Sequence, residues 1–167
     1  MADLLDLAIR FSTNKFSEVG KKNHFLRVLA VLKDEFKISD EEVLVATVLH
    51  DTLEDTNTTY EEIEKKFSKN IADIVREVSH PKGYNDEQKI EFYKKLQTIS
   101  PKAKLLKLAD FADNLRNIIK ERKANPSSPY HNQYILRIRE FLKSCPPSYE
   151  VETVFRLTQE LGEFVTE

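Results

Sequence analysis

The sequence has very little glycine, a single cysteine and no long apolar run. Glycine occurs only 3 times in 167 residues, and because it is the usual residue of tight turns and hairpins, its scarcity favours helices. Cys145 is the only cysteine, so no internal disulfide can form. No apolar stretch approaches the roughly 18 residues that a transmembrane helix requires. The sequence therefore indicates a mainly helical protein that does not span a membrane.

The chain also lacks an excess of charge of either sign. Its 26 basic and 28 acidic residues give a formal net charge of -2, which does not fit a protein that coats a nucleic acid polymer. The N-terminus has early acidic residues and no basic region, so a secretory signal is not expected. These features predict a cytoplasmic protein with one domain, residues 1–167, that could still bind a small anion through a local basic cluster.

Apolar residues recur at helical spacing along almost the whole sequence, and no segment alternates as a strand would. We therefore expect an all-α bundle of eight or nine helices. Ser39 and Thr58 are each followed three residues later by a glutamate, the spacing of a capping box. Ser100 before Pro101 is typical of a helix start with proline in the first position. The expected helices lie near residues 4–11, 23–32, 40–51, 60–67, 69–78, 86–98, 101–122, 130–143 and 148–165.

The segment LHDTLEDT, residues 49–56, places acidic side chains at the end of an apolar helix. His50 and Glu54 are four residues apart, and so are Asp51 and Asp55. If the helix continues, each pair lies on adjoining faces. One imidazole and three carboxylates so close together suit Mn²⁺, Fe²⁺ or Zn²⁺. The alternative is a helix end with solvated acids and a capping histidine, and this segment alone does not decide between the two.

Two further features favour a metal site. Asp110 and Asn114 interrupt the apolar face of the helix KLLKLADFADNLRNI, residues 104–118, and a buried aspartate needs a partner such as a metal ion. His24 lies at the start of the second expected helix, in a chain with 4 histidines. The alternatives are an exposed Asp110 or one paired with Lys107, and a His24 that acts as a cap or a core residue.

The order of these residues resembles the H…HD…D signature of the HD phosphohydrolases, with His24 first, then His50-Asp51, then Asp110. LHDTLEDT and AKLLKLADFADNLRNI are similar to the HD-x-x-ED and KLAD-x-x-x-N elements of RelA/SpoT-type (p)ppGpp hydrolase domains and their small single-domain relatives. The resemblance covers about residues 20–120, and the two elements together are a specific signal. It implies the all-helical HD-domain fold.

The resemblance also implies roles for individual residues. It implies one divalent metal ion, expected to be Mn²⁺. The ion would have four ligands: His24, His50, Asp51 and Asp110. Glu54 and Asp55 become the pair that orients and deprotonates the attacking water or assists the leaving group. Because two nearby carboxylates repel one another, one of them could hold a proton near neutral pH. Asn114 is expected to approach the ribose and a phosphate.

Basic residues near these motifs are candidates for binding substrate phosphates. For each of them the alternative interpretation is an ordinary solvated residue on the surface. The candidates are Lys21, Lys22, Lys104 and Lys107. The loop HPKGYN, residues 80–85, is a further candidate for the rim of a substrate site, although His80 and Lys82 could equally be ordinary loop residues.

The segment before the first histidine differs from its counterpart in most members of this branch. There it is basic, contains glycine, ends in a Pro-Tyr pair and helps hold the purine base. Here the segment NKFSEVGKKNHF is shorter and lacks that pair, and Phe25 stands where proline is usual. The resemblance therefore specifies the metal centre but leaves open the base, the phosphate removed and the oligomeric state.

The activity implied is that of a small alarmone hydrolase, which removes the 3′-pyrophosphate of the nucleotide (p)ppGpp. No synthetase domain is expected, because the chain ends soon after the hydrolase-like helices. Three alternatives remain. One is an HD phosphohydrolase for another nucleotide, such as the 2′-phosphate of NADPH or a nucleoside phosphate. A nucleotide-binding HD protein without turnover would not need Glu54 and Asp55, and a purely structural bundle would not need Asp110 and Asn114 on an apolar face.

Overall fold

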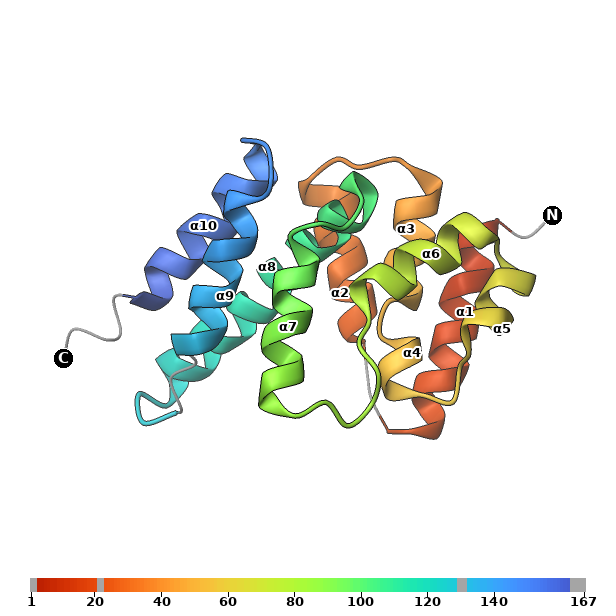
Figure 1. Cartoon of the computed structure of the whole chain (residues 1–167), viewed down its shortest axis with the longest axis horizontal. Coiled ribbons are helices and arrows are strands. Elements are labelled where there is room, and N and C mark those ends of the chain that lie inside the picture. Colours follow the sequence, from red (N-terminus) through yellow and green to blue (C-terminus); the bar gives the residue numbers. More distant parts are fainter. Residues whose placement is uncertain (1–2, 21–22, 129–131, 163–167) are drawn as a thin grey trace.

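The computed structural model describes residues 3–20, 23–128 and 132–162, and the regular structure in these ranges is helical throughout. When the π-helical η1 is counted with α2, and α4 with α3, these ranges contain nine helices, which confirms the expected all-α bundle (Figure 1). Within them, no helix is both long and apolar enough to cross a membrane. The elements are α1 (Leu4–Glu18), α2 (His24–Ala30), η1 (Val31–Glu35), α3 (Glu41–Leu49), α4 (Thr52–Asp55), α5 (Tyr60–Lys66), α6 (Lys69–Val78), α7 (Asp86–Leu96), α8 (Pro101–Ala124), α9 (Asn132–Lys143) and α10 (Tyr149–Gly162).

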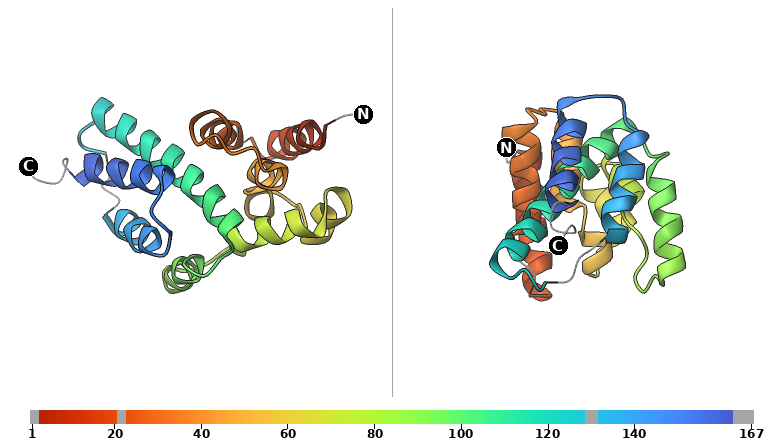
Figure 2. Two further views of the ribbon diagram at one scale, coloured as in Figure 1. Left: turned by 90° about the horizontal axis from the view of Figure 1, so that it is seen from above. Right: turned by 90° about the vertical axis from the view of Figure 1, so that its left-hand side faces the viewer.

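Two helices organise the packing. Every residue of α3 from Val43 to Leu49 is buried, because a helix that is apolar on all sides is stable only inside a core. This helix packs against α1, α2, α6 and α8. The long α8 also contacts α10, so it joins the α1–α6 part of the molecule to the C-terminal helices (Figures 1 and 2). As expected, Ser100 caps α8 and Pro101 is its first residue.

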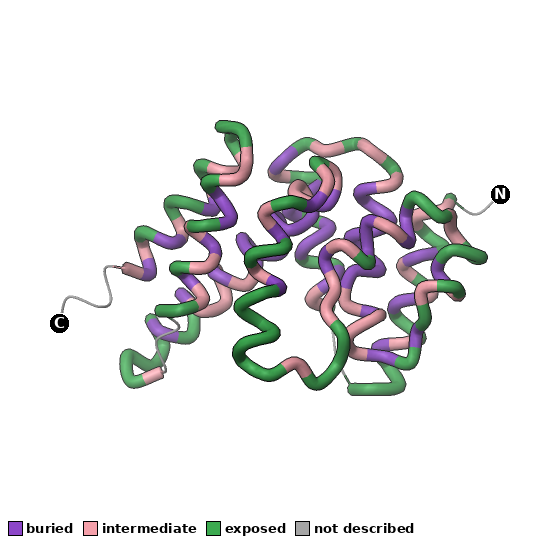
Figure 3. The backbone as a smooth tube through the Cα atoms, in the orientation of Figure 1, coloured by how far each residue is buried: buried purple, intermediate pink, exposed green. Residues whose placement is uncertain are grey.

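Helix α7 packs on the outside of the bundle. Figure 3 shows buried residues gathered in the middle of the molecule, whereas α7 is exposed along most of its length. Phe92 and Leu96 are its buried residues. The helix contacts α9, and the loop that precedes it comes from the end of α6. One side of α7 lines a pocket together with residues of α2, α4, α8 and α9.

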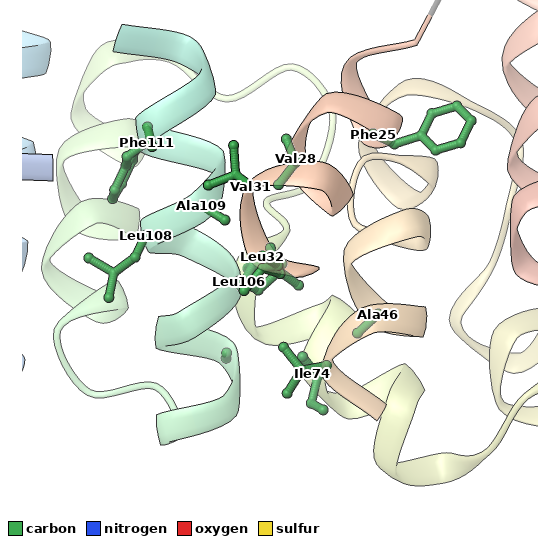
Figure 4. Close-up of a cluster of buried hydrophobic side chains, with 14 of the residues drawn as sticks. Phe25, Val28, Val31, Leu32, Ala46, Ile74, Leu106, Leu108, Ala109 and Phe111 are labelled. Atoms are coloured by element: carbon green, nitrogen blue, oxygen red, sulfur yellow. The ribbon is translucent and has the colours of Figure 1, made fainter. Parts of the chain in front are cut away.

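The position of α2 is fixed from two sides. Val28 and Val31 lie between α2–η1 and α8, where Ala109 faces them (Figure 4). Phe25 points in the other direction and stacks on Phe16 of α1, with the ring centroids 5.4 Å apart (Figure 4). Burying side chains of this size contributes about 1.5–3 kcal/mol each. Both contacts hold the helix whose first residue is His24.

The residue before α2 has an unusual backbone conformation. Asn23 adopts a left-handed conformation with φ 61° and is the N-cap residue of the helix, but its side chain makes no capping hydrogen bond. Asparagine is among the few residues other than glycine that adopt this conformation at low cost. The chain therefore changes direction at Asn23, immediately before His24.

Two helix starts differ by one residue from those expected. The side chain of Asp40, not Ser39, accepts a hydrogen bond from the backbone of α3. Thr59, not Thr58, does the same for α5, while the hydroxyl of Thr58 pairs with that of Thr56 at 2.7 Å. Aspartate and threonine are as suitable for this position as the residues expected, so local spacing could not distinguish the adjacent candidates.

Candidate functional site

Three parts of the fold bring the expected metal ligands together. His24 begins α2, His50 and Asp51 lie between α3 and α4, and Asp110 lies in the middle of α8. His24, His50 and Asp51 each offer a donor atom within 4.8 Å of the others. Oδ1 of Asp110 is 3.0 Å from Nε2 of His24 and 3.7 Å from Nε2 of His50. The folded chain thus joins residues as far as 86 positions apart.

His50 has the features of a metal ligand prepared by its surroundings. Its Nδ1 donates to the backbone carbonyl of Thr47, with 2.6 Å between N and O, so the lone pair of the neutral ring is on Nε2. Nε2 is buried and makes no hydrogen bond among the described residues, yet Oδ1 of Asp51 lies 3.1 Å away. A buried ring nitrogen without a hydrogen bond but beside carboxylate oxygens fits a bound cation, which would satisfy both.

The two imidazoles hold protons strongly when no metal is bound. Burial lowers the pKa of His50, but the charges of Asp51 and Asp110 outweigh it and raise that pKa to about 9. Burial likewise lowers the pKa of His24, while the hydrogen bond to Asp110 and its charge raise it above the ordinary value. The carboxylates therefore create a potential that attracts protons, and a divalent cation would be attracted by the same charges.

Asp110 is buried and ionised. Burial alone would raise its pKa, but the Lys107 ammonium and the two imidazoles lower it well below the usual range. Its Oδ2 accepts from Nζ of Lys107 at 2.6 Å, and its Oδ1 accepts from Nδ2 of Asn114 at 3.0 Å. The pairing with Lys107 considered from the sequence is thus present, and it occupies Oδ2 while Oδ1 faces the histidines.

Glu54 and Asp55 lie in α4, beside the cluster, and both line the same pocket as His24 and Asp51. Oε1 of Glu54 accepts from the backbone N–H of His80 at 2.9 Å. Burial is the main cause that raises the pKa of Glu54, and the charge of Asp51 acts in the same direction. The raised pKa expected for one member of the pair is therefore found at Glu54, with burial rather than repulsion by Asp55 as its chief cause.

The pocket has a volume of about 420 Å³ and extends from the cluster towards α7 and α9. Four of its polar residues were not predicted from the sequence: Lys89, Tyr93, Tyr134 and Arg137. Burial raises the pKa of both tyrosines above the usual value, so their hydroxyls remain protonated and can donate hydrogen bonds. These residues follow no motif, and only an amphipathic pattern that predicted α7 and α9 to face the pocket could have indicated them.

The lysines expected at the substrate site are distributed differently. Lys107 and Asn114 line the pocket. Lys104 does not, because its Nζ donates to the carbonyl of Ser144 at 2.7 Å. Lys21 and Lys22 lie outside the described residues. In the expected rim loop, residues 80–85, His80 lines the pocket, whereas Nζ of Lys82 donates to the carbonyl of Thr56 at 2.6 Å.

Comparison with known proteins gives relatives in one branch of enzymes. The chain is 40% identical over 130 residues to guanosine-3′,5′-bis(diphosphate) 3′-pyrophosphohydrolase MESH1 of Xenopus tropicalis, covering 70% of each chain. It is 41% identical over 101 residues to MESH1 of Drosophila melanogaster, which is 58% of this chain and about half, 54%, of that protein. It is 33% identical over 97 residues to the bifunctional (p)ppGpp synthase/hydrolase SpoT of Escherichia coli, or 54% of this chain and 14% of that one.

Solved structures and a family model agree with these relatives. The structure of a metazoan orthologue of SpoT that hydrolyses ppGpp superposes with a TM-score of 0.74 at 27% identity, covering 98% of this chain and 94% of that one. A Listeria monocytogenes protein at 24% identity shares the fold, with a TM-score of 0.67. The model of the HD domain matches residues 5–134. The chain therefore belongs to the HD-domain family, in the branch that includes MESH1 and SpoT.

Proposed function

We propose that the chain is a metal-dependent phosphohydrolase that removes the 3′-pyrophosphate of (p)ppGpp. The observation that carries this proposal is the convergence of two imidazoles and two carboxylates at one end of the pocket that Glu54 and Asp55 line. Such a set provides metal ligands and a separate group that accepts protons. The names of the relatives supply the substrate, because MESH1 is a guanosine-3′,5′-bis(diphosphate) 3′-pyrophosphohydrolase.

The proposed metal ligands are His24, His50, Asp51 and Asp110, and the proposed ion is Mn²⁺. A set of imidazoles and carboxylates without a thiolate suits Mn²⁺, which prefers nitrogen and oxygen donors. When bound, the ion would lower the pKa of water and neutralise negative charge on the phosphate. Lys107, which donates to Asp110, would offset part of the negative charge of this ligand set.

The acid–base work is proposed for Glu54 and Asp55. The raised pKa of Glu54 brings this carboxyl closer to neutral pH, where a group can both accept and return a proton. The backbone N–H of His80 fixes the orientation of Glu54. Asn114 donates to Asp110 with its amide nitrogen and lines the pocket, and we place its side chain against the ribose of the substrate.

The substrate is tested with a panel of nucleotides. Purified protein with Mn²⁺ is incubated with guanosine tetra- and pentaphosphate, nucleoside mono- and triphosphates and NADPH, and the products are separated by chromatography. We expect pyrophosphate and GDP from guanosine tetraphosphate, because cleavage at the 3′ position leaves the 5′-diphosphate intact. If NADPH is hydrolysed and guanosine tetraphosphate is not, the substrate is a 2′-phosphate instead. If neither nucleotide is hydrolysed, the proposal is contradicted.

Metal binding should release protons. At pH 7 His50 is protonated in the metal-free protein, because its pKa is about 9, and a metal can bind its Nε2 only after the proton has left. Titration calorimetry in buffers of different ionisation enthalpy should therefore detect about one to two protons released per Mn²⁺. The apparent affinity should rise with pH and level off above pH 9. An affinity that does not change between pH 6 and 9 would contradict this assignment.

The remaining sequence-based expectations concern the whole chain. We propose that residues 1–167 form one domain, because the buried apolar residues from α1 to α10 belong to one connected cluster. The cytoplasmic location stays a prediction.

A further inference from the structure

The two histidines of the cluster are oriented by different kinds of partner. Nδ1 of His50 donates to a carbonyl one turn earlier in the same helix, that of Thr47. His24 is the first residue of α2, so no helical turn precedes it to offer such a carbonyl. Its Nδ1 lies instead 2.8 Å from Oδ2 of Asp113, on α8. His24 thus depends on a side chain from another helix for the orientation of its ring.

We propose that Asp113 is a positioning residue for His24, which keeps the proton on Nδ1 and so presents Nε2 to the metal. The proposal rests on the metal-dependent function proposed above. Asp113 is buried, with 6% of its surface exposed, and a carboxylate can only accept a hydrogen bond. Nδ1 must therefore carry the proton. Nε2 then faces the cluster, 3.0 Å from Oδ1 of Asp110 and 3.7 Å from Oδ2 of Asp51.

Two further side chains hold Asp113 in this role. Nε of Arg27 donates to both carboxylate oxygens, at 3.1 and 3.2 Å, and its positive charge compensates for the burial of the carboxylate. Nδ2 of Asn117, one turn further along α8, donates to Oδ2 at 3.3 Å. With these donors in place, the carboxylate cannot rotate freely, and its oxygen remains aimed at the imidazole.

On both α2 and α8, a proposed metal ligand is followed about one turn later by a member of the Arg27–Asp113 ion pair. On α2 the ligand His24 is followed three residues later by Arg27, and on α8 the ligand Asp110 is followed three residues later by Asp113. Residues three apart lie on the same side of a helix. The ion pair between Arg27 and Asp113 therefore lies about one turn from the level where His24 and Asp110 meet.

A purely structural reading is that Asp113 only pairs with Arg27 and joins the two helices. The two readings differ in what removal of each partner does. If Asp113 positions His24, Asp113→Asn should weaken Mn²⁺ binding by about 10–100-fold. The reason is that Nε of Arg27 holds the amide oxygen, so the amide NH2 faces Nδ1 and Nδ1 can no longer carry the proton. Arg27→Met keeps the acceptor for Nδ1 and should weaken binding by less than about threefold. If only the ion pair matters, the two variants should have equal effects.

Mn²⁺ affinity is measured by competition with a chelator, without substrate, and folding is followed by circular dichroism. Asp73→Asn is the matched control, because Asp73 also accepts hydrogen bonds from Tyr60, Lys69 and Arg76 but lies outside the pocket. It should bind Mn²⁺ as the unaltered protein does. An affinity of Asp113→Asn within about twofold of the control would overturn the proposal. If the unaltered protein binds no metal at all, this proposal and the proposed function both fail.

A second measurement uses the unaltered protein and does not depend on whether the variant folds. In the protein loaded with Zn²⁺, which is diamagnetic, ¹⁵N–¹H spectra of the imidazoles should show a proton on Nδ1 of His24, protected from exchange by Asp113. Its absence, or coordination of the metal through Nδ1, would overturn the assignment while leaving the metal-dependent function intact.

Discussion

His50→Ala protein should contain almost no Mn²⁺ after dialysis and should hydrolyse guanosine tetraphosphate at a rate near background. Three remaining ligands hold a divalent ion less well than four, and Asp51 and Asp110 would lose the imidazole between them. Loss of an orienting partner alone costs about 10–100-fold in metal affinity or activity, so loss of a ligand should exceed this range. Metal content by atomic emission and turnover by chromatography measure the two effects.

His50 is buried, so its replacement could also affect folding. His50→Gln is therefore made in parallel, because the longer amide fills more of the space while offering a poorer ligand. Both variants are compared by thermal unfolding in the presence of a chelator, where the metal makes no contribution. If either folded variant keeps its full metal content and activity, His50 is not a ligand.

The double variant Glu54→Gln, Asp55→Asn should bind Mn²⁺ normally and turn over about 10²–10⁴-fold more slowly. The amides preserve the size of the side chains, and the carbonyl oxygen of the new amide at position 54 could still accept from the backbone of His80, as Glu54 does. An amide cannot accept a proton at neutral pH, however, so general acid–base assistance of about that magnitude is lost. Metal content, KM and kcat are measured separately.

The separate measurements distinguish the possible roles of this pair. A loss of metal would make Glu54 or Asp55 a ligand, and near-normal kcat would leave neither of them a part in proton transfer. The single variant Glu54→Gln should account for most of the effect, because burial raises the pKa of Glu54 towards neutrality. The pH optimum of kcat should then change with this residue.

The four residues of the His/Asp cluster could be predicted because their order resembles the H…HD…D signature of the HD phosphohydrolases. His50 and Asp51 are adjacent, and Asp110 interrupts an apolar helix face. Both features can be recognised from the sequence alone. Lys104 could not be assigned by proximity in sequence alone. It precedes Asp110 by six residues, or about 600° of helical rotation, which places it roughly 120° from that residue on the helix. Lys107, three residues before Asp110, lies on the same side and does reach it.

Other parts of the site depend on tertiary packing and left no local signal. Tyr134 and Arg137 are one turn apart on α9, but the sequence does not indicate that α9 packs beside α7 and lines the same pocket. In the sequence, Asp113 is one of many charged residues of a long helix. Its role becomes apparent only from the packing of α2 against α8. The predicted N-caps of α3 and α5 differ by one residue from the observed ones, Asp40 and Thr59, because neighbouring side chains can cap a helix equally well.

The left-handed conformation of Asn23 makes the position of His24 independent of the segment that precedes it. His24 is held by α2 and by side chains of α8, so its place does not depend on how the chain arrives. Because the chain turns at Asn23, the segment before it can differ in length and composition without moving the ligand, which accords with its lack of the Pro-Tyr pair. Asparagine, aspartate or glycine would suit residue 23, whereas a β-branched side chain would be strained. Selection could thus change the segment before Asn23 while the His/Asp cluster stays as it is.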